Sequence, residues 1–437
     1  MIIIVFGKTC ILRLTVCVLM LLGCATTQPS PLDKWEFINR SQTISSGVNG
    51  DVRVTVALPT IAEAGAIYGV KLSSQSIQPL WLEVINSGTA PYWFLAPGLD
   101  PNHFSPSEAA FAFYIESDEA NRQLSNAFSQ MQFKNPVQPG MSEAGFVLVN
   151  LDEGYKAVDI DLLSHEKVEN FSFIFTDPDF RADYKIVDFN NLYADEEIIH
   201  IEDDASLRQE LEALPCCSTN ADGDRNADPV NLVLVGEIRD IVPALVRRNW
   251  HATEVMWSKA IFRTIKSFFG GQRYRYAPIS SLHLYGRRQD AGWQKARANV
   301  IQRNHLRLWL SPIRYRGKQV FIGQVSRDIG VKFTTKSPTL TTHVIDPDVD
   351  EARRSFVEAM VYSQAVERIG YVSGVGRSTA AAPRMNLTAD PVYTDGLRAV
   401  LFFGRRSHTL SEIELLNWES PSALYLHKIK TEDSSPK

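Results

Sequence analysis

Charged and apolar side chains alternate along residues 278–353, and this pattern limits the chain to few kinds of structure. A period of two is typical of β-strands, whose successive side chains point to opposite faces of a sheet. We therefore predict strands here, with polar groups on strand faces and at strand ends, and we expect this segment to hold the functional residues. The candidates for ligand binding or catalysis are Arg287, Asp290, Arg303, His305, Arg307, His343, Asp346, Asp348 and Asp350.

These residue types suit a ligand that carries phosphate. The forked donors of arginine match the geometry of phosphate oxygens. Either histidine can act as a general acid or base near neutral pH, and the aspartates can orient a histidine or hold a metal ion. The alternative is structural: the same groups can form internal salt bridges, and the aspartates at 346–350 can cap a following helix.

Common hydrolase and nucleotide-binding signatures are missing from the sequence. It contains no G-x-S-x-G, no H-E-x-x-H and no P-loop. It also has no C-x-x-C pair, and three of its five cysteines precede residue 25, so a metal cluster built on cysteine is not expected. The sequence leaves open which cofactor or metal the protein binds, if any.

The first 23 residues have the pattern of a secretory signal peptide. A short apolar run at 14–22 follows Lys8 and Arg13. The tetrad Leu21-Leu22-Gly23-Cys24 resembles a bacterial lipoprotein box, in which the cysteine is lipidated, for example with palmitate, and becomes the new N-terminus. The alternatives are an ordinary cleaved signal or an uncleaved anchor.

The lipoprotein resemblance implies a place in the cell envelope. Residue 25 is an alanine rather than an aspartate, which favours sorting to the outer membrane. We therefore expect a protein that faces the periplasm and is attached to the membrane by a lipid on Cys24, with residues 24–34 as a flexible tether. A nucleic-acid partner is not expected in this compartment.

Residues 35–180 are predicted to form an all-β, Ig-like sandwich. Strands separated by turn residues at regular spacing are typical of such folds. Two stretches at 107–113 and 118–131 have helical character and are interpreted as an insertion. The short alternating runs, broken by glycine, proline and asparagine, are 52–58, 80–86, 144–151 and 171–176.

Charge divides the chain into an acidic and a basic part. Residues 25–215 hold 11 lysines and arginines against 29 acidic residues, a net charge of −18. Residues 216–437 hold 32 against 21, a net charge of +11. The basic part suits an anionic partner, unless the two parts neutralise each other. The acidic segment 181–211 is predicted to be a linker.

Residues 212–404 are predicted to form an α+β domain, followed by a polar tail over 405–437. The adjacent Cys216 and Cys217 can close a vicinal disulfide in an oxidising periplasm. The alternative is two free or intermolecular thiols. The main elements expected in the domain are strands at 231–236, 281–285, 305–310, 319–325 and 397–403 and a long helix at 350–369.

Several blocks of this domain occur in a fixed order. They are Leu214-Pro215-Cys216-Cys217, the strand 231–236, Gly286-Arg287 with Gln289-Asp290, Arg303 with His305-Leu306-Arg307-Leu308-Trp309, and Thr342-His343 with Asp346-Pro347-Asp348 and Asp350. Together they resemble the LssY C-terminal domain family over roughly residues 212–404. Asn304 stands where a second histidine is expected, which argues against a metal at that block.

The LssY resemblance implies no particular reaction, because the family has no established biochemical activity. Some members carry the domain beside membrane-embedded phosphatase-like or transporter-like segments, which implies work in the envelope or on lipids. We expect an envelope lipoprotein that binds an anionic ligand, a phosphate-bearing lipid or glycan, or another envelope protein. The alternatives are a phosphate-ester hydrolase that uses His305 or His343 with arginine and aspartate partners, and a structural adaptor of an envelope complex.

Overall fold

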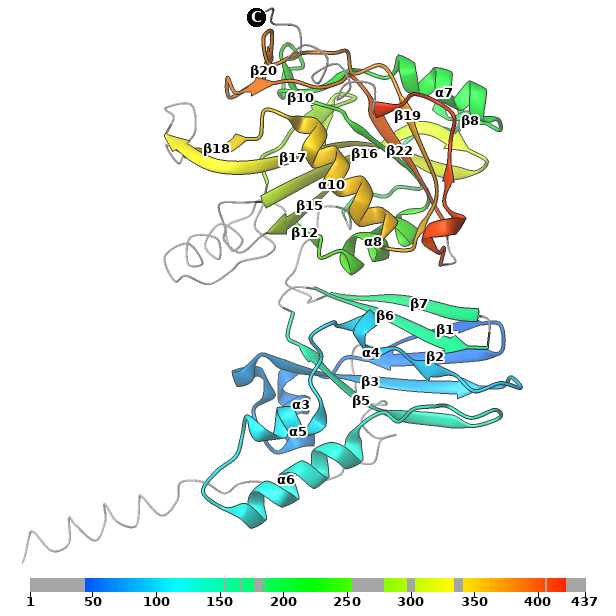
Figure 1. Ribbon diagram of the computed structural model, residues 1–437, viewed down its shortest axis with the longest axis vertical. Coiled ribbons are helices and arrows are strands. Elements are labelled where there is room, and N and C mark those ends of the chain that lie inside the picture. Colours follow the sequence, from blue (N-terminus) through cyan, green and yellow to red (C-terminus); the bar gives the residue numbers. More distant parts are fainter. Residues whose placement is uncertain are drawn as a thin grey trace, which may run out of the picture. The chain divides into compact units, whose positions relative to one another are not determined.

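The structure, a computed structural model, describes residues 44–152, 155–165, 167–176, 184, 186–253, 279–296, 303–333, 341–404 and 407–421 (Figure 1). These residues form two compact units. The first unit ends at Asp152 and also includes Ile160–Phe171, and the second includes Glu153–Asp159 and resumes at Ser172. The expected signal peptide, Cys24 and the tether lie outside the described residues. No described helix is both long enough and apolar enough to cross a bilayer.

The first unit is built on a four-stranded sheet in the order β1-β2-β3-β5. Each of these strands is antiparallel to its neighbour. A smaller sheet has the order β4-β6-β7, and the residues of β6 and β7 are divided between the two units. The strands are β1 (Ile44–Asn49), β2 (Val52–Ala57), β3 (Ile77–Asn86), β4 (Trp93–Phe94), β5 (Ser142–Asn150), β6 (Tyr155–Ser164) and β7 (Lys167–Thr176).

Helices cover one face of the four-stranded sheet, so the first unit is strand-rich but not all-β. The large apolar side chains Trp81 and Phe146 lie on this face and pack against Tyr68 of α3 and Phe128 of α6. Burying these rings requires a covering layer, and amphipathic helices supply it. The helices of this unit are α3 (Ile61–Tyr68), α4 (Ala96–Leu99), α5 (Pro106–Phe111), α6 (Asp118–Met131) and the 3-10 turn η1 (Leu72–Gln75).

The second unit contains a ten-stranded sheet whose main path is β12-β15-β16-β17-β11-β22-β19-β23, with β18 on β17 and β8 on β16. Neighbours are antiparallel except β11·β22, β19·β23 and β16·β8. The strands are β8 (Ile199–Ile201), β11 (Leu232–Val235), β12 (His251–Ala252), β15 (Ala291–Ala296), β16 (Arg303–Tyr315), β17 (Lys318–Phe333), β18 (Thr341–Ile345), β19 (Val366–Val372), β22 (Arg398–Phe403) and β23 (Glu414–Leu415).

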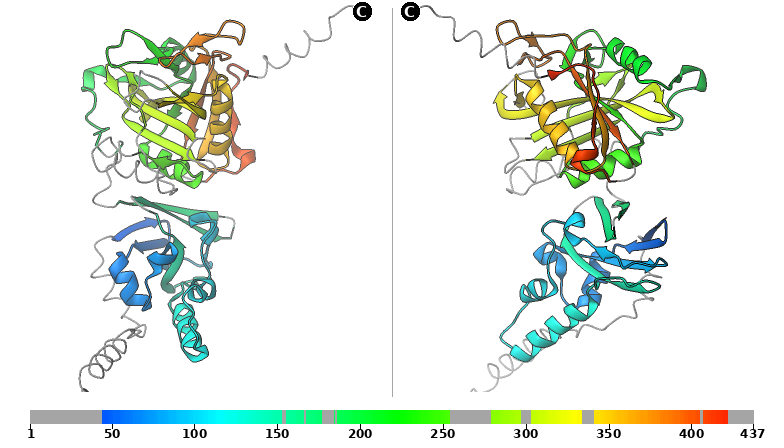
Figure 2. Two further views of the ribbon diagram at one scale, coloured as in Figure 1. Left: turned by 90° about the vertical axis from the view of Figure 1, so that its left-hand side faces the viewer. Right: turned by 45° about the vertical axis from the view of Figure 1, so that its right-hand side comes forward.

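The large sheet is covered on both faces. One face packs its apolar side chains against α8 (Ile238–Arg247) and α10 (Val349–Val361), and α10 lies along this face in Figures 1 and 2. The other face packs against α7 and a small sheet in the order β10-β9-β13-β14. The remaining elements are α7 (Asp204–Ala213), β9 (Cys217–Thr219), β10 (Asn226–Pro229), β13 (His283–Leu284), β14 (Arg287–Arg288), β20 (Arg384–Met385), β21 (Pro391–Val392), η3 (Asp195–Glu197) and η4 (Leu410–Glu412).

The expected order of a strand-rich region followed by a mixed α+β region is confirmed. Parts of the chain that the sequence assigned to a linker and a tail belong to the second unit. Residues 199–213 form β8 and α7, because Leu207 and Leu211 enter the core. Residues 414–415 form β23 on the sheet edge, and Trp418 packs on Phe402.

A single buried arginine ties several of these segments together. Arg398, the first residue of β22, is 0 % exposed. Its guanidinium donates hydrogen bonds of 2.6–3.3 Å to five carbonyl oxygens, those of Leu211, Leu214, Pro215, Val230 and Gly374. Desolvation lowers the pKa of Arg398 to about 10, so the side chain stays charged at neutral pH.

Replacing Arg398 should destabilise the second unit severely. Arg398→Met leaves five carbonyls without this donor, two of them in buried hydrogen bonds, so we expect the free energy of unfolding to fall by about 3 kcal/mol. Urea denaturation measures this change. Arg354→Met is the matched control, because the ion pair of Arg354 with Glu351 is exposed and should contribute less than about 1 kcal/mol. Equal effects of the two substitutions would contradict the role of Arg398.

Candidate functional site

One face of the large sheet carries a row of polar side chains. On β16, Arg303, His305 and Arg307 alternate with the residues that face the core under α8 and α10. On β17, Ser326 lies opposite His305 and Gln324 lies opposite Arg307, so the row continues across both strands. We call this group the polar layer. Its described members are Asp228, Gln294, Arg303, His305, Arg307, Gln324, Ser326 and Asp328.

Hydrogen bonds hold the two arginines of the polar layer. Arg307 is 3 % exposed. It donates from Nη1 to Oε1 of Gln324 at 2.8 Å, from Nε to the carbonyl of Ser280 at 3.0 Å, and from Nη2 to the hydroxyl of Ser280 at 2.9 Å. Arg303 donates from Nη1 to Oε1 of Gln294 at 2.9 Å. Burial lowers the pKa of both guanidinium groups, but arginine remains charged at neutral pH.

Two buried donors in the polar layer have no acceptor within the part of the chain that the structure describes. They are Nε of Arg303 and Nε2 of Gln324, and Gln324 is only 1 % exposed. Leaving such a group unsatisfied costs about 1–3 kcal/mol. Because both groups are N–H donors, a ligand that satisfies them has to present acceptor atoms.

Asp328 and His305 form a titratable pair within the layer. Oδ2 of Asp328 lies 3.5 Å from Nε2 of His305. Burial raises the pKa of the Asp328 carboxyl, the charges of Arg307 and Arg303 lower it, and the charge of Asp228 raises it, with a net pKa of about 7. Asp328 is therefore partly protonated at neutral pH.

Asp228 brings a second carboxyl to the layer from the small sheet. Burial raises its pKa, while the positive charge of Arg307 and a hydrogen bond from Asn386 lower it. The side-chain amide of Asn386 donates to Oδ1 of Asp228 at 3.1 Å. Oδ1 of Asn386 accepts from the backbone N–H groups of Thr388 and Asp390, which fixes the loop between β20 and β21 beside the layer.

Arg287 and Asp290, also candidates from the sequence, form a separate structural pair. The guanidinium of Arg287 donates to both carboxylate oxygens of Asp290 at 2.9 and 3.0 Å. It also donates to the carbonyl of Leu310 at 2.7 Å, and Asp290 accepts from the N–H of Leu310 at 2.7 Å. The pairing of β16 with β17 shifts between Leu310 and Arg314, so this pair satisfies backbone groups at an irregularity.

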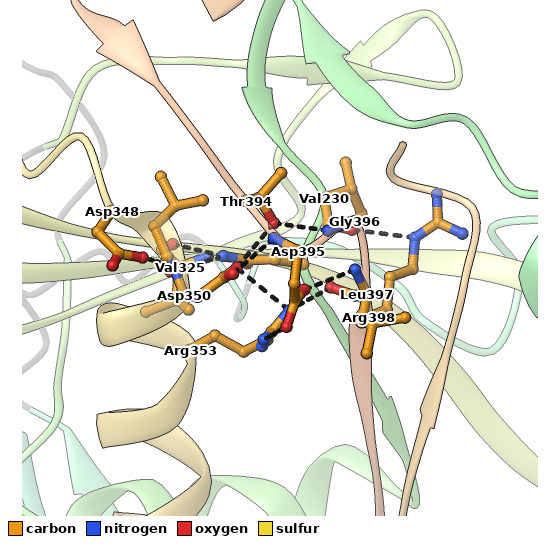
Figure 3. A network of polar contacts seen from close by, with 12 residues as sticks. Val230, Val325, Asp348, Asp350, Arg353, Thr394, Asp395, Gly396, Leu397 and Arg398 are labelled. Atoms are coloured by element: carbon orange, nitrogen blue, oxygen red, sulfur yellow. Dashed lines mark hydrogen bonds and ion pairs between the residues drawn. The ribbon is translucent and has the colours of Figure 1, made fainter. Parts of the chain in front are cut away.

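The three aspartates at 346–350 act at the start of α10, as the structural alternative proposed (Figure 3). Oδ1 of Asp348 accepts from the N–H of Asp350, and Oδ1 of Asp346 accepts from the N–H of Asp348. Asp350 accepts at 2.7 Å from both the Thr394 hydroxyl and the Asp395 N–H. Beside them, Arg353 pairs with Asp395, which ties α10 to the segment before β22. Burial raises the pKa of Asp348 and of Asp350.

His343, the remaining candidate for ligand binding or catalysis, lies in β18, opposite Val331 of β17. Cys216 and Cys217 are joined by a disulfide, and Cys24 lies outside the described residues. Within those residues, no three histidine, cysteine, aspartate or glutamate side chains come together as a metal site would require.

The structure therefore divides eight of the nine candidates into three groups, places His343 on β18, and adds residues that the sequence did not single out. Alternation in the sequence could have identified three of the added residues on β17, as it did the candidates on β16. These are Gln324, Ser326 and Asp328, which alternate with Gly323, Val325 and Arg327.

No sequence pattern identifies the other three added residues, Asp228, Ser280 and Asn386. They reach the layer from separate segments, and only tertiary contacts bring them there.

Residues 208–397 match the family model described as LssY C-terminus. The match covers most of the large sheet and the whole polar layer, and it confirms the resemblance seen in the sequence. No curated protein sequence matches the chain.

The titration of Asp328 should make stability depend on pH. The folded chain holds this proton more tightly than the unfolded chain, in which aspartate titrates near pH 4. The raised pKa of Asp328 therefore adds to the free energy of unfolding below about pH 4, and this addition is lost as the pH rises through 7. Its full size is on the order of 4 kcal/mol at most. Asp328→Asn stays neutral, so its free energy of unfolding should fall less than that of the wild type between pH 5 and pH 8.

Urea denaturation at several pH values tests this expectation. Asp222→Asn serves as the control, because Asp222 is exposed in a turn and should leave the wild-type pH dependence unchanged. If Asp328→Asn has the same slope against pH as the wild type, Asp328 does not titrate in this range.

Proposed function

Because residues 208–397 form an LssY C-terminal domain, we propose that this domain binds a phosphate-bearing, anionic ligand in its polar layer. The family match identifies the domain but supplies no ligand. The chemistry of the layer therefore has to support the proposal by itself.

The observation that carries the proposal is the pair of buried donors without acceptors, Nε of Arg303 and Nε2 of Gln324. Neighbouring N–H groups of Arg307 are already bonded to Gln324 and Ser280, so that guanidinium is held in position before any ligand arrives. Preorganised donors lose little conformational entropy on binding. An oxyanion such as a phosphate group offers acceptors for both unsatisfied donors.

The charge of the layer also favours an anion. Arg303 and Arg307 remain positive at neutral pH. The pKa of Asp328 lies near 7, so this carboxyl is partly neutral, and burial also raises the pKa of Asp228. Two arginines facing Asp228 and a partly protonated Asp328 leave the layer with a residual positive charge, which a ligand anion compensates.

A second candidate function is hydrolysis of a phosphate ester at the same layer. The observation that favours it is the contact of His305 with Asp328 at 3.5 Å, with an aspartate pKa near neutrality. A general acid or base works best when its pKa lies near the working pH. In this reading, His305 or Asp328 moves the proton and the arginines stabilise the charge on phosphate.

We also propose that the protein is an outer-membrane lipoprotein. The lipoprotein box at Leu21-Leu22-Gly23-Cys24 and the basic, apolar leader before it support this proposal. In such a place, the ligand would be a phosphorylated lipid or glycan of the envelope.

Ligand binding should depend on the unsatisfied donors. We expect orthophosphate and glycerol phosphate to raise the melting temperature of the full chain in detergent, by mass action, and uncharged glycerol at the same concentration to have no effect. Gln324→Leu and Arg303→Met should each weaken binding about tenfold or more, whereas Arg354→Met should not.

Isothermal titration gives the affinities, and para-nitrophenyl phosphate in parallel reports turnover. Binding without turnover supports the first candidate, and turnover that is lost in His305→Gln supports the second. Phosphate binding that is equal in wild type, Gln324→Leu and Arg303→Met would place any anion site elsewhere.

Membrane attachment should depend on Cys24. Cys24→Ser removes the only thiol that the lipoprotein box offers for acylation, so we expect the protein to lose labelled palmitate and to leave the membrane fraction. Expression in a bacterial host with metabolic labelling measures both. Cys17→Ser is the control, and an equal palmitate signal in the wild type and Cys24→Ser would reject this anchor.

A further inference from the structure

The two sulfur atoms of the Cys216–Cys217 disulfide have different surroundings. Cys217 opens β9 and is 5 % exposed, whereas Cys216 is only half-buried. The guanidinium of Arg384 donates from Nη1 to Sγ of Cys217 at 3.9 Å. One sulfur is thus more accessible, and the other lies beside a cation.

We propose that this bond is a redox-active site with a fixed polarity, in which a dithiol reductant attacks Cys216 and Cys217 is the leaving group. A thiolate of the reductant forms a bond to Sγ of Cys216 as the Cys216–Cys217 bond breaks, and the electron pair of that bond stays on Sγ of Cys217. The second thiol of the reductant then loses its proton and displaces Cys216. The protein gains two electrons and two protons, and the reductant becomes a disulfide.

Arg384 is positioned to stabilise the leaving thiolate. Its Nη1 also donates to the carbonyl of Val375 at 2.8 Å, which holds the guanidinium beside Cys217. Gly376, with φ of +77°, leaves room for the Arg384 side chain. A Cβ at residue 376 would lie 2.5 Å from Nη2 of Arg384. A neighbouring cation lowers the pKa of a thiol, and a leaving thiol of lower pKa departs faster.

The backbone on both sides of the bond is held independently of the disulfide. Arg398 binds the carbonyls of Leu214 and Pro215 at 2.9 and 2.6 Å, and the carbonyl of Cys216 accepts from the N–H of Val230 at 2.9 Å. Cys217 pairs with Pro229 between β9 and β10. The two reduced thiols therefore stay adjacent, and the bond can form again without refolding. This site uses no residue of the polar layer, so its test is independent of the test of the proposed function.

Trapping with a monothiol tests the polarity. The full chain in detergent is treated with limiting reduced glutathione, quenched with iodoacetamide, and digested, and mass spectrometry of the peptide that contains residues 216–217 locates the adduct. We expect glutathione on Cys216. Glutathione on Cys217 would overturn the proposal.

The rate of reduction by dithiothreitol tests the part played by Arg384. Arg384→Gln should reduce about fivefold more slowly than the wild type, and Arg384→Lys should recover part of the rate because it keeps the charge. Arg377→Gln, which removes an exposed charge from the same region, is the control. Urea midpoints confirm that each variant is folded. A purely structural disulfide predicts equal rates in all four proteins, and that result would overturn the role of Arg384.

Discussion

The buried guanidinium of Arg398 is the interaction on which the second unit depends. Its five acceptors belong to α7, to the turn before the disulfide, to the segment between β10 and β11, and to the loop after β19. Apolar side chains of α7 and of Val230 also pack in one core cluster, but these backbone carbonyls need a donor that a nonpolar core does not offer. One charged group with several donors satisfies them all at once, and Arg398 itself begins the strand that pairs with β11.

Buried charge plays two different parts in this domain. Around Arg398, and between Arg353, Asp350 and Asp395, the polar groups have partners and connect elements of the fold (Figure 3). In the polar layer, the partners are incomplete within the described residues, since Arg303 and Gln324 keep donors without acceptors. Two unsatisfied N–H donors suit a ligand that carries acceptor atoms, whereas a satisfied network suits stability.

Much of the fold follows from periodicity. The strands at 305–310 and 319–325 and the strand-rich first unit were predictable from alternation. Helical spacing predicted a helix at 350–369, but α10 ends at Val361 and residues 366–369 belong to strand β19. The helix α3 was not predicted, although Thr60 and Glu63 form a capping box at its start and Gly69 ends it, and Tyr68 packs against Phe128 and Phe146.

The sequence by itself determined that Arg303, His305 and Arg307 share one face of a strand, because a period of two decides the face. It also predicts a leader and a lipoprotein box, because both rest on local patterns in residues 8–24. Only the tertiary structure decided which charged groups meet. Strand register places Gln324 and Ser326 beside the β16 residues, long-range contacts bring Asp228 and Ser280, and the cap of α10 removes Asp348 and Asp350 from the site. Such encounters depend on distances between segments far apart in the chain, and periodicity along the chain carries no information about those distances.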